Sequence, residues 1–273
     1  MRESAFDVLW IYMFYFLYSR LIIIMIFLIK FKNMSIKEII SLDKRRQIAN
    51  FSKEVLTKFA TSAYSQEGED MILRRIFNDK KSGFFVDVGA FHPTRFSNTY
   101  YFYKRGWRGI NIDAMPDSMN KFDKQRPRDI NVEVPIASKK HSLKYFAFNE
   151  PALNTFSEEL AAERNGKDGY KILFERDIET YTLKEVLDKY LPDDVKEIDF
   201  YSIDVESLDF DVLISNDWSK YKPKIILIED LKFDVNNLSK SEIVSFLAEK
   251  DYKFLAKTVN TLFFKLNSFI IDE

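Results

Sequence analysis

The sequence has no cysteine, only two histidines, His92 and His141, and seven glycines among 273 residues. Without cysteine the chain can form no disulfide, no thiolate metal site and no thiol nucleophile. Two histidines also argue against a multi-histidine zinc site. A net charge of −1 indicates no electrostatic surface for nucleic acid. Carboxylates, hydroxyls and amides are therefore the groups left for chemistry.

The charge is unevenly distributed. The first 60 residues contain ten Lys or Arg and five Asp or Glu, so they carry +5 and the rest of the chain carries −6. Residues 8–29 form an apolar run of 22 residues whose only charge is Arg20. As a helix this run is long enough to span a bilayer. Basic residues follow it, so the positive-inside rule places the remaining chain in the cytoplasm.

We therefore expect a membrane-anchor helix over residues 1–33 and a basic amphipathic helical linker over residues 34–63. Three alternatives stay open. The first is that the run is a cleaved signal peptide, although no small-residue cleavage site follows it. The second is that translation starts at Met34, which leaves a soluble cytoplasmic protein. The third is that the apolar helix packs on the rest of the protein instead of entering a membrane.

Residues 64–267 alternate between short apolar runs and helical stretches, and residues 268–273 form a tail. The expected strands are 84–88, 109–113, 130–136, 198–204, 224–229, 252–256 and 261–266. The expected helices are 68–78, 97–104, 116–124, 183–191, 206–216 and 239–250, the last with Ser239 as its N-cap. This order predicts an α/β fold, a mostly parallel sheet with helices on both faces and a closing hairpin that contains an antiparallel strand. Residues 142–181 are irregular and read as an insertion over the sheet.

Ligands of such sheets bind at the carboxyl ends of the strands. Four expected strands end in or beside a carboxylate: Asp87, Asp113, Asp204 and Glu229. Four such residues on different strands favour one shared crevice over four unrelated helix caps.

The loop after Asp87 contains a single glycine, Gly89, followed by the bulky Phe91 and Pro93. A dinucleotide site has three glycines that let the backbone approach a pyrophosphate, so NAD is disfavoured. Asp113 at the end of the second strand can accept two hydrogen bonds from a ribose diol. A nucleoside bound without phosphate indicates S-adenosylmethionine.

Several segments resemble the FkbM family of S-adenosylmethionine-dependent methyltransferases, in order and spacing from about Tyr64 to Leu266. They are SQEGED at 65–70, VDVGA at 86–90, HP at 92–93, SNT at 97–99, RGWRGINID at 105–113, RP at 126–127 and IDVE at 203–206. The resemblance implies a seven-stranded, Rossmann-like class I methyltransferase fold. It also implies O-methylation of a sugar, a glycan or another hydroxyl-bearing acceptor.

The resemblance further implies roles for individual residues. Asp87 and Gly89 shape the loop beside the methionine part of the cofactor, Asp113 holds the ribose, and adenine approaches Glu133. Gln66 belongs to the leading helix that covers the cofactor site. The residues at the reaction end are Asp204, which also belongs to the cofactor site, Glu206 and, across the crevice, Glu229.

The sequence departs from the family pattern at three places. Asp113 stands where glutamate is usual, Ser207 replaces a glycine, and Ala114–Met115 replaces Pro–Asn. Because of these changes an alternative function stays open, that of a non-catalytic relative that binds the cofactor or a partner.

Methyl transfer to a hydroxyl needs a group that accepts the hydroxyl proton. The candidates are Asp204, Glu206, Glu229 and His92. A histidine in this position is more often a structural hydrogen-bonding group. A divalent metal held by Asp204, Glu206, Glu229 and Asp230 is an alternative that we do not favour.

The basic pairs Arg105/Arg108 and Arg126/Arg128 suit an anionic acceptor such as a phosphorylated glycan. Solvated surface charge is their default interpretation. Trp107, within the same stretch, is expected to pack in the core and not on a sugar.

Overall fold

The computed structural model describes residues 18–22, 24, 44, 60–78, 80–205 and 208–271. The chain divides into two units, residues 1–62 and 63–273. Most of the expected membrane anchor and linker lies outside the described residues, as do Glu206 and Ser207. Among the residues that the structure does describe, no helix has the length and apolar character needed to cross a bilayer.

The second unit is built on a seven-stranded sheet with the order β3-β2-β1-β6-β7-β9-β8. The strands are β1 (Phe84–Val88), β2 (Arg108–Asp113), β3 (Ile130–Glu133), β6 (Phe200–Ile203), β7 (Ile225–Glu229), β8 (Tyr252–Lys257) and β9 (Thr261–Leu266). Only β9 among these runs antiparallel to its neighbours, β7 and β8. The predicted seven-stranded, mostly parallel sheet with a closing hairpin is confirmed.

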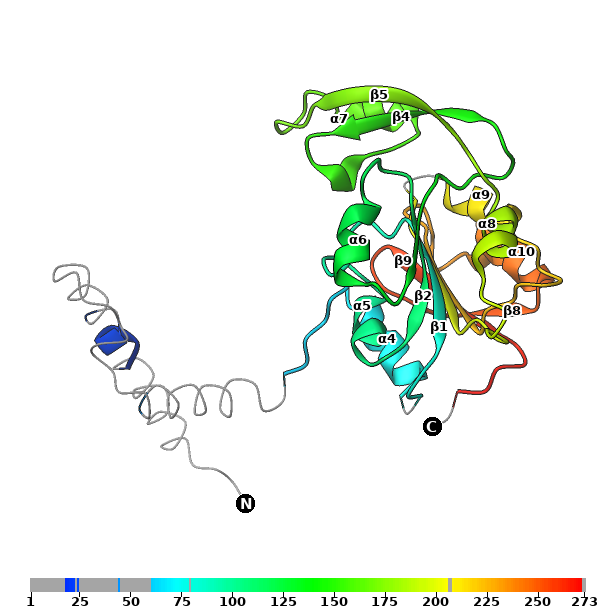
Figure 1. Cartoon of the computed structure of the whole chain (residues 1–273). Helices are drawn as coiled ribbons and strands as arrows, with labels where there is room; N and C mark the ends of the chain where they lie inside the picture. The colour runs from blue at the N-terminus through cyan, green and yellow to red at the C-terminus, as the bar shows by residue number, and fades with distance from the viewer. Residues whose placement is uncertain are drawn as a thin grey trace, which may run out of the picture. The chain divides into compact units, whose positions relative to one another are not determined.

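Helices cover both faces of the sheet (Figure 1). One face carries α4 (Glu69–Ile76), α5 (Tyr100–Lys104) and α6 (Met119–Gln125). The other carries α8 (Leu183–Tyr190), α9 (Asp209–Ile214) and α10 (Glu242–Glu249), the last preceded by the short 3₁₀ helix η2 (Leu238–Lys240).

The alternation of side chains along β1 explains the two helical layers. Phe84, Val86 and Val88 pack into the core beneath α8, α9 and α10. Phe85 points to the opposite face, where it joins a second core that includes Trp107. Because both faces of a central parallel strand are buried, every residue of β1 is buried and all but Asp87 are apolar. The predicted packing role of Trp107 is confirmed, since this side chain is 1% exposed.

Two boundaries differ from the sequence-based expectation. Strand β3 ends at Glu133 and not at Ile136, because Pro135 has no backbone N–H for the ladder. Helix α10 is capped by Ser241, whose side chain accepts a hydrogen bond from the Val244 N–H at 3.3 Å. The predicted N-cap, Ser239, instead lies in η2.

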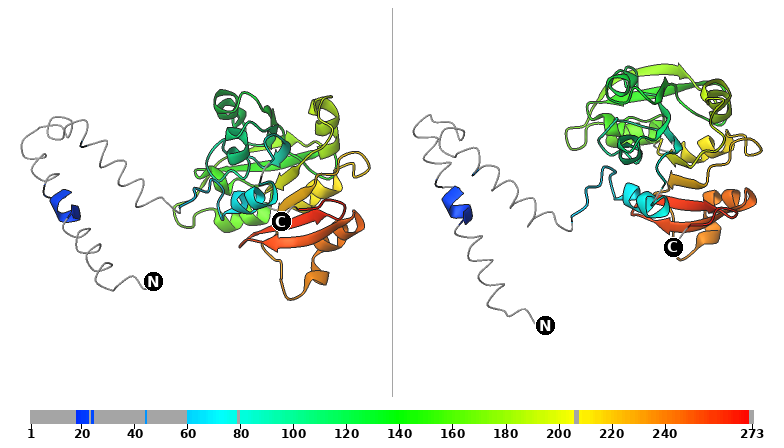
Figure 2. Two further views of the ribbon diagram at one scale, coloured as in Figure 1. Left: turned by 90° about the horizontal axis from the view of Figure 1, so that it is seen from below. Right: turned by 60° about the horizontal axis from the view of Figure 1, so that its bottom comes forward.

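Residues 142–179, here called the cap, form a second layer across one end of the sheet (Figures 1 and 2). The cap contains β4 (Ser142–Phe148), η1 (Pro151–Leu153), α7 (Glu158–Arg164) and β5 (Ile172–Glu179). Strands β4 and β5 pair antiparallel with each other and form a sheet of their own. The expected insertion over the sheet is therefore an ordered structure.

Candidate active site

A cleft opens at the carboxyl ends of β1, β2, β6 and β7, beneath the cap. Gly89 follows β1 with a φ of +81°, and an added Cβ would lie 1.7 Å from the Asp204 carbonyl oxygen. Its N–H donates to the Ile112 carbonyl oxygen at 2.9 Å. Glycine is required here because the loop must pass directly over the end of β6 in a left-handed conformation.

Asp113 ends β2 and lines the cleft. Its Oδ2 accepts the Phe91 N–H and its Oδ1 accepts the Met115 N–H, both at 2.8 Å. Burial raises the pKa of Asp113. Each carboxylate oxygen has a second lone pair, so both can accept one further hydrogen bond from a vicinal diol.

Asp87 lies beneath the cleft and not on its surface. It is 5% exposed, and its Oδ2 accepts the Thr99 hydroxyl at 2.9 Å. Burial raises the pKa of Asp87, while the Arg126 guanidinium opposes this rise. Through its hydrogen bond with Thr99, Asp87 therefore holds in place the loop that follows β1.

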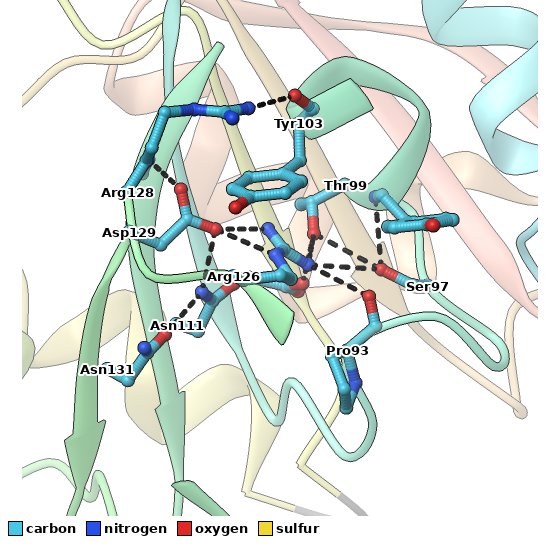
Figure 3. Close-up of polar contacts among 12 residues, drawn as sticks. Pro93, Ser97, Thr99, Tyr103, Asn111, Arg126, Arg128, Asp129 and Asn131 are labelled. Carbon is cyan, nitrogen blue, oxygen red and sulfur yellow. Dashed lines mark hydrogen bonds and ion pairs between the residues drawn. The ribbon is translucent and has the colours of Figure 1, made fainter. Parts of the chain in front are cut away.

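Thr99 belongs to a buried polar network that stands next to the cleft (Figure 3). Arg126 is fully buried and donates from Nη1 to the Thr99 hydroxyl at 2.9 Å and from Nε to Asp129 Oδ2 at 2.7 Å. Asp129 also accepts the Gly109 N–H at 3.0 Å and the Asn111 amide at 3.1 Å. The network ties β2 to the loop that follows β1.

This network corrects the surface interpretation for Arg126 alone, because Arg105 and Arg128 are exposed and Arg108 is partly exposed. Arg126 is an internal ion-pair partner, Arg128 donates to the Tyr103 carbonyl oxygen, and Arg108 pairs with Asp194. None of them lines the cleft. The sequence contained one signal for the buried pair, the three-residue spacing of Arg126 and Asp129.

The start of α4 and the segment before it form one wall of the cleft with Gln66, Glu67 and Glu69. Glu67 accepts the Asn260 N–H at 2.9 Å, which ties the segment to the β8–β9 turn. Glu69 is buried and accepts the Thr258 hydroxyl at 3.2 Å. Gln66 is thus held at the cleft by the residues that follow it.

Asp204 and Glu229 line the same cleft from the ends of β6 and β7. The Asp204 N–H donates to the Val88 carbonyl oxygen at 3.0 Å, which joins the end of β6 to the end of β1. Glu229 pairs in register with Thr261 of β9. The structure therefore brings Gln66, Gly89, Asp113, Asp204 and Glu229 together.

The model of the methyltransferase FkbM domain matches residues 87–254, which is more than half of the chain. The protein belongs to the FkbM methyltransferase family. A comparison with curated proteins finds no match. Among solved structures, the chain is similar to a proposed RNA methyltransferase from Pyrococcus horikoshii, with 9% identity and a TM-score of 0.38 over 73% of this chain and 83% of that one.

Besides Asp87, two residues predicted for the site of this FkbM methyltransferase do not line the cleft. His92 Nδ1 accepts the N–H groups of Thr94 at 3.2 Å and Arg95 at 3.1 Å. Burial and two nearby cations, Lys121 and Arg95, lower the pKa of His92. His92 therefore stabilises its own loop as a neutral ring whose Nδ1 lone pair is occupied.

Glu133 is the other residue outside the lining. It is exposed at the end of β3, opposite Asp113 in the β2–β3 register. The next three residues, 134–136, do line the cleft. They supply an apolar surface beside Asp113.

Among the residues that the structure describes, no group of three His, Asp or Glu side chains is placed so that it could hold a metal ion. Glu206, one of the four ligands considered, lies outside those residues.

The cap contributes residues that sequence reasoning missed. Tyr145 and Asn154 line the cleft, and the Asn154 amide donates to the Tyr145 hydroxyl at 2.7 Å. Burial and the Asp113 carboxylate raise the pKa of Tyr145, which keeps its hydroxyl protonated. The cap thus adds the neutral polar groups of Tyr145 and Asn154 to the cleft of this FkbM methyltransferase.

Proposed function

We propose that the protein is an S-adenosylmethionine-dependent O-methyltransferase that acts on a hydroxyl of a sugar or glycan. The observation that carries this proposal is the environment of Asp113. Asp113 lines a cleft with no phosphate-binding loop, and each of its oxygens accepts one backbone N–H. This arrangement suits a nucleoside that carries a ribose diol and no phosphate.

Different residues of the cleft take different roles in binding and in the reaction. Asp113 holds the ribose, the Gly89 loop passes beside the methionine part, and residues 134–136 face the adenine. S-adenosylmethionine supplies an activated methyl group when bound. Asp204 and Glu229 orient the acceptor hydroxyl and accept its proton, because they are the carboxylates at the ends of β6 and β7.

Calorimetry of the full chain with S-adenosylhomocysteine tests the cofactor assignment. We expect Asp113→Ala to weaken binding about tenfold or more, since hydrogen bonds to a charged group contribute about 1.5–3 kcal/mol each. Asp177→Ala, which removes an exposed carboxylate of the cap, is the matched control. A folded chain that does not bind the ligand would contradict the proposal.

The pH dependence gives a second readout of the same site. A protonated Asp113 cannot accept both ribose hydroxyls, so affinity should fall as the pH is lowered. Because burial raises the pKa of Asp113, the fall should begin at a higher pH than for an ordinary aspartate. Asp113→Ala should lack this dependence. Transfer of a labelled methyl group to sugar acceptors then tests the reaction itself.

We also propose that residues 1–33 anchor the enzyme to a membrane, with the methyltransferase domain in the cytoplasm. The apolar run at 8–29 and the basic residues after it support this. In fractionated cells the full chain should pellet with membranes and be released by detergent but not by salt. A chain that starts at Met34 should stay in the supernatant. Recovery of the full chain in the supernatant would refute the anchor.

A further inference from the structure

The loop between β1 and α5 holds two aromatic residues in an unusual backbone conformation. Phe91 has a φ of 52° and Phe96 a φ of 54°. Side-chain-bearing residues rarely adopt this left-handed region, and those that do gather at active sites and ligand clamps. Both rings line the cleft. The strained backbone of this loop therefore places two aromatic rings at the site.

The two rings form one surface. Their centroids are 6.2 Å apart and their planes differ by 18°. The Arg95 guanidinium lies 4.4 Å from the Phe96 centroid and 5.6 Å from the Phe91 centroid, and it pairs with Glu150 of the cap at 3.8 Å. Phe96 nevertheless remains 42% exposed. A cleft-lining aromatic ring that stays this exposed is typical of a binding surface.

The position of Phe96 connects it with the reaction end of the cleft. Two residues later, the Asn98 amide donates to the Ser202 hydroxyl of β6 at 3.1 Å. Strand β6 ends one residue before Asp204. The ribose site at Asp113 already has its own apolar neighbours in residues 134–136. Phe96 is thus placed to contact the methyl acceptor and not the ribose.

The charge of the cleft limits what that acceptor is. Its described lining residues include five carboxylates and no Lys, Arg or His. The carboxylates are Glu67, Glu69, Asp113, Asp204 and Glu229. Like charges brought together across an interface repel each other, which excludes wrong partners. Arg95, which lies beside Phe96, pairs with Glu150 and is not among the lining residues, so an acceptor with a carboxylate or phosphate inside the cleft would be repelled.

Resting on the proposed function, we propose that Phe96, supported by Phe91, is the platform for an uncharged or amino sugar. A pyranose has an apolar face of C–H groups and a rim of hydroxyls. The C–H face stacks on the electron-rich face of the Phe96 ring, while the carboxylates Asp204 and Glu229 accept hydrogen bonds from the hydroxyls. Acidic and phosphorylated sugars are excluded from the cleft.

The test uses the full chain saturated with S-adenosylhomocysteine, and saturation-transfer NMR with methyl glycosides of glucose, galactose and mannose. We expect transfer to the ring C–H protons of at least one of them. Phe96→Ala should weaken that sugar about tenfold, while Phe96→Tyr should retain it and leave the affinity for S-adenosylhomocysteine unchanged. Leu173→Ala, which truncates an exposed cap residue outside the cleft, is the matched control.

The glucuronic acid glycoside should bind about tenfold or more weakly than the neutral sugar. Equal binding of the acidic sugar would overturn the proposal, as would the absence of transfer to every neutral glycoside. If Phe96→Ala weakens S-adenosylhomocysteine as much as the sugar, the ring belongs to the cofactor and the proposal fails. If the wild-type chain does not bind S-adenosylhomocysteine, the proposed function fails as well.

Discussion

Replacement of Gly89 by alanine is expected to destabilise the domain by several kcal/mol and to abolish cofactor binding. A Cβ would stand 1.7 Å from the Asp204 carbonyl oxygen, and the φ of +81° is unfavourable for alanine. The left-handed conformation costs about 1–2 kcal/mol, and forced overpacking costs about 1–3 kcal/mol or more. Relief of the clash would move the end of β6 and, with it, Asp204.

Gly106→Ala is the matched control for this variant. Gly106 has a φ of +95°, but nothing lies within 4 Å of an added Cβ. It therefore carries the backbone cost without the clash. Urea unfolding gives the free energy of each variant, and calorimetry with S-adenosylhomocysteine gives its affinity. Equal stability of the two variants would show that the loop after β1 is not pressed against β6.

The sheet could be predicted from the sequence because its strands carry their own signals. Strand β1 is buried on both faces and apolar except for Asp87, and a glycine that turns the chain follows it. The ends of the strands then follow from parallel pairing, so Gly89, Asp113, Asp204 and Glu229 meet in one cleft. Local pattern and chain order are enough for this part of the site.

The cap could not be predicted in the same way. Strands β4 and β5 are separated by a long connection that contains η1 and α7. The sequence therefore lacks the tight turn that would indicate their pairing. Strand β5 is exposed along most of its length, which removes the alternation that marks a half-buried strand. No sequence pattern therefore indicated that Tyr145 and Asn154 line the cleft.

Arg126 was missed for a different reason. An arginine in a polar stretch is expected to be solvated, and its burial depends on residues far away in the chain. Thr99 comes from the segment that leads into α5, and Phe85, whose ring centroid lies 5.3 Å from the guanidinium carbon, comes from β1. Such an environment exists only once the sheet has formed.

Arg126→Met is expected to lower the free energy of unfolding by about 3–5 kcal/mol, because it leaves a buried charge without its partner. Asp129 would lose the guanidinium that lies 2.7 Å from its Oδ2. Asp87 would lose the cation that opposes the rise of its pKa. Urea unfolding measures the effect. Arg105→Met, which removes an exposed arginine, should change stability by less than about 0.5 kcal/mol.

The pH dependence distinguishes the lost charge pair from lost packing. In Arg126→Met the pKa of Asp129 should rise further than burial already raises it. A carboxyl whose folded-state pKa is raised binds its proton more tightly when folded, so acidification favours the folded state. The stability deficit relative to wild type should therefore shrink as the pH is lowered.

A second substitution tests the same pair directly. Asp129→Asn removes the charge but keeps an oxygen that can accept the Gly109 N–H. The double variant Arg126→Met/Asp129→Asn should recover part of the stability that Arg126→Met loses, because no buried charge is then left unpaired. A deficit that is independent of pH and unchanged in the double variant would mean that Arg126 acts through its packing against Phe85, Tyr103 and Phe122.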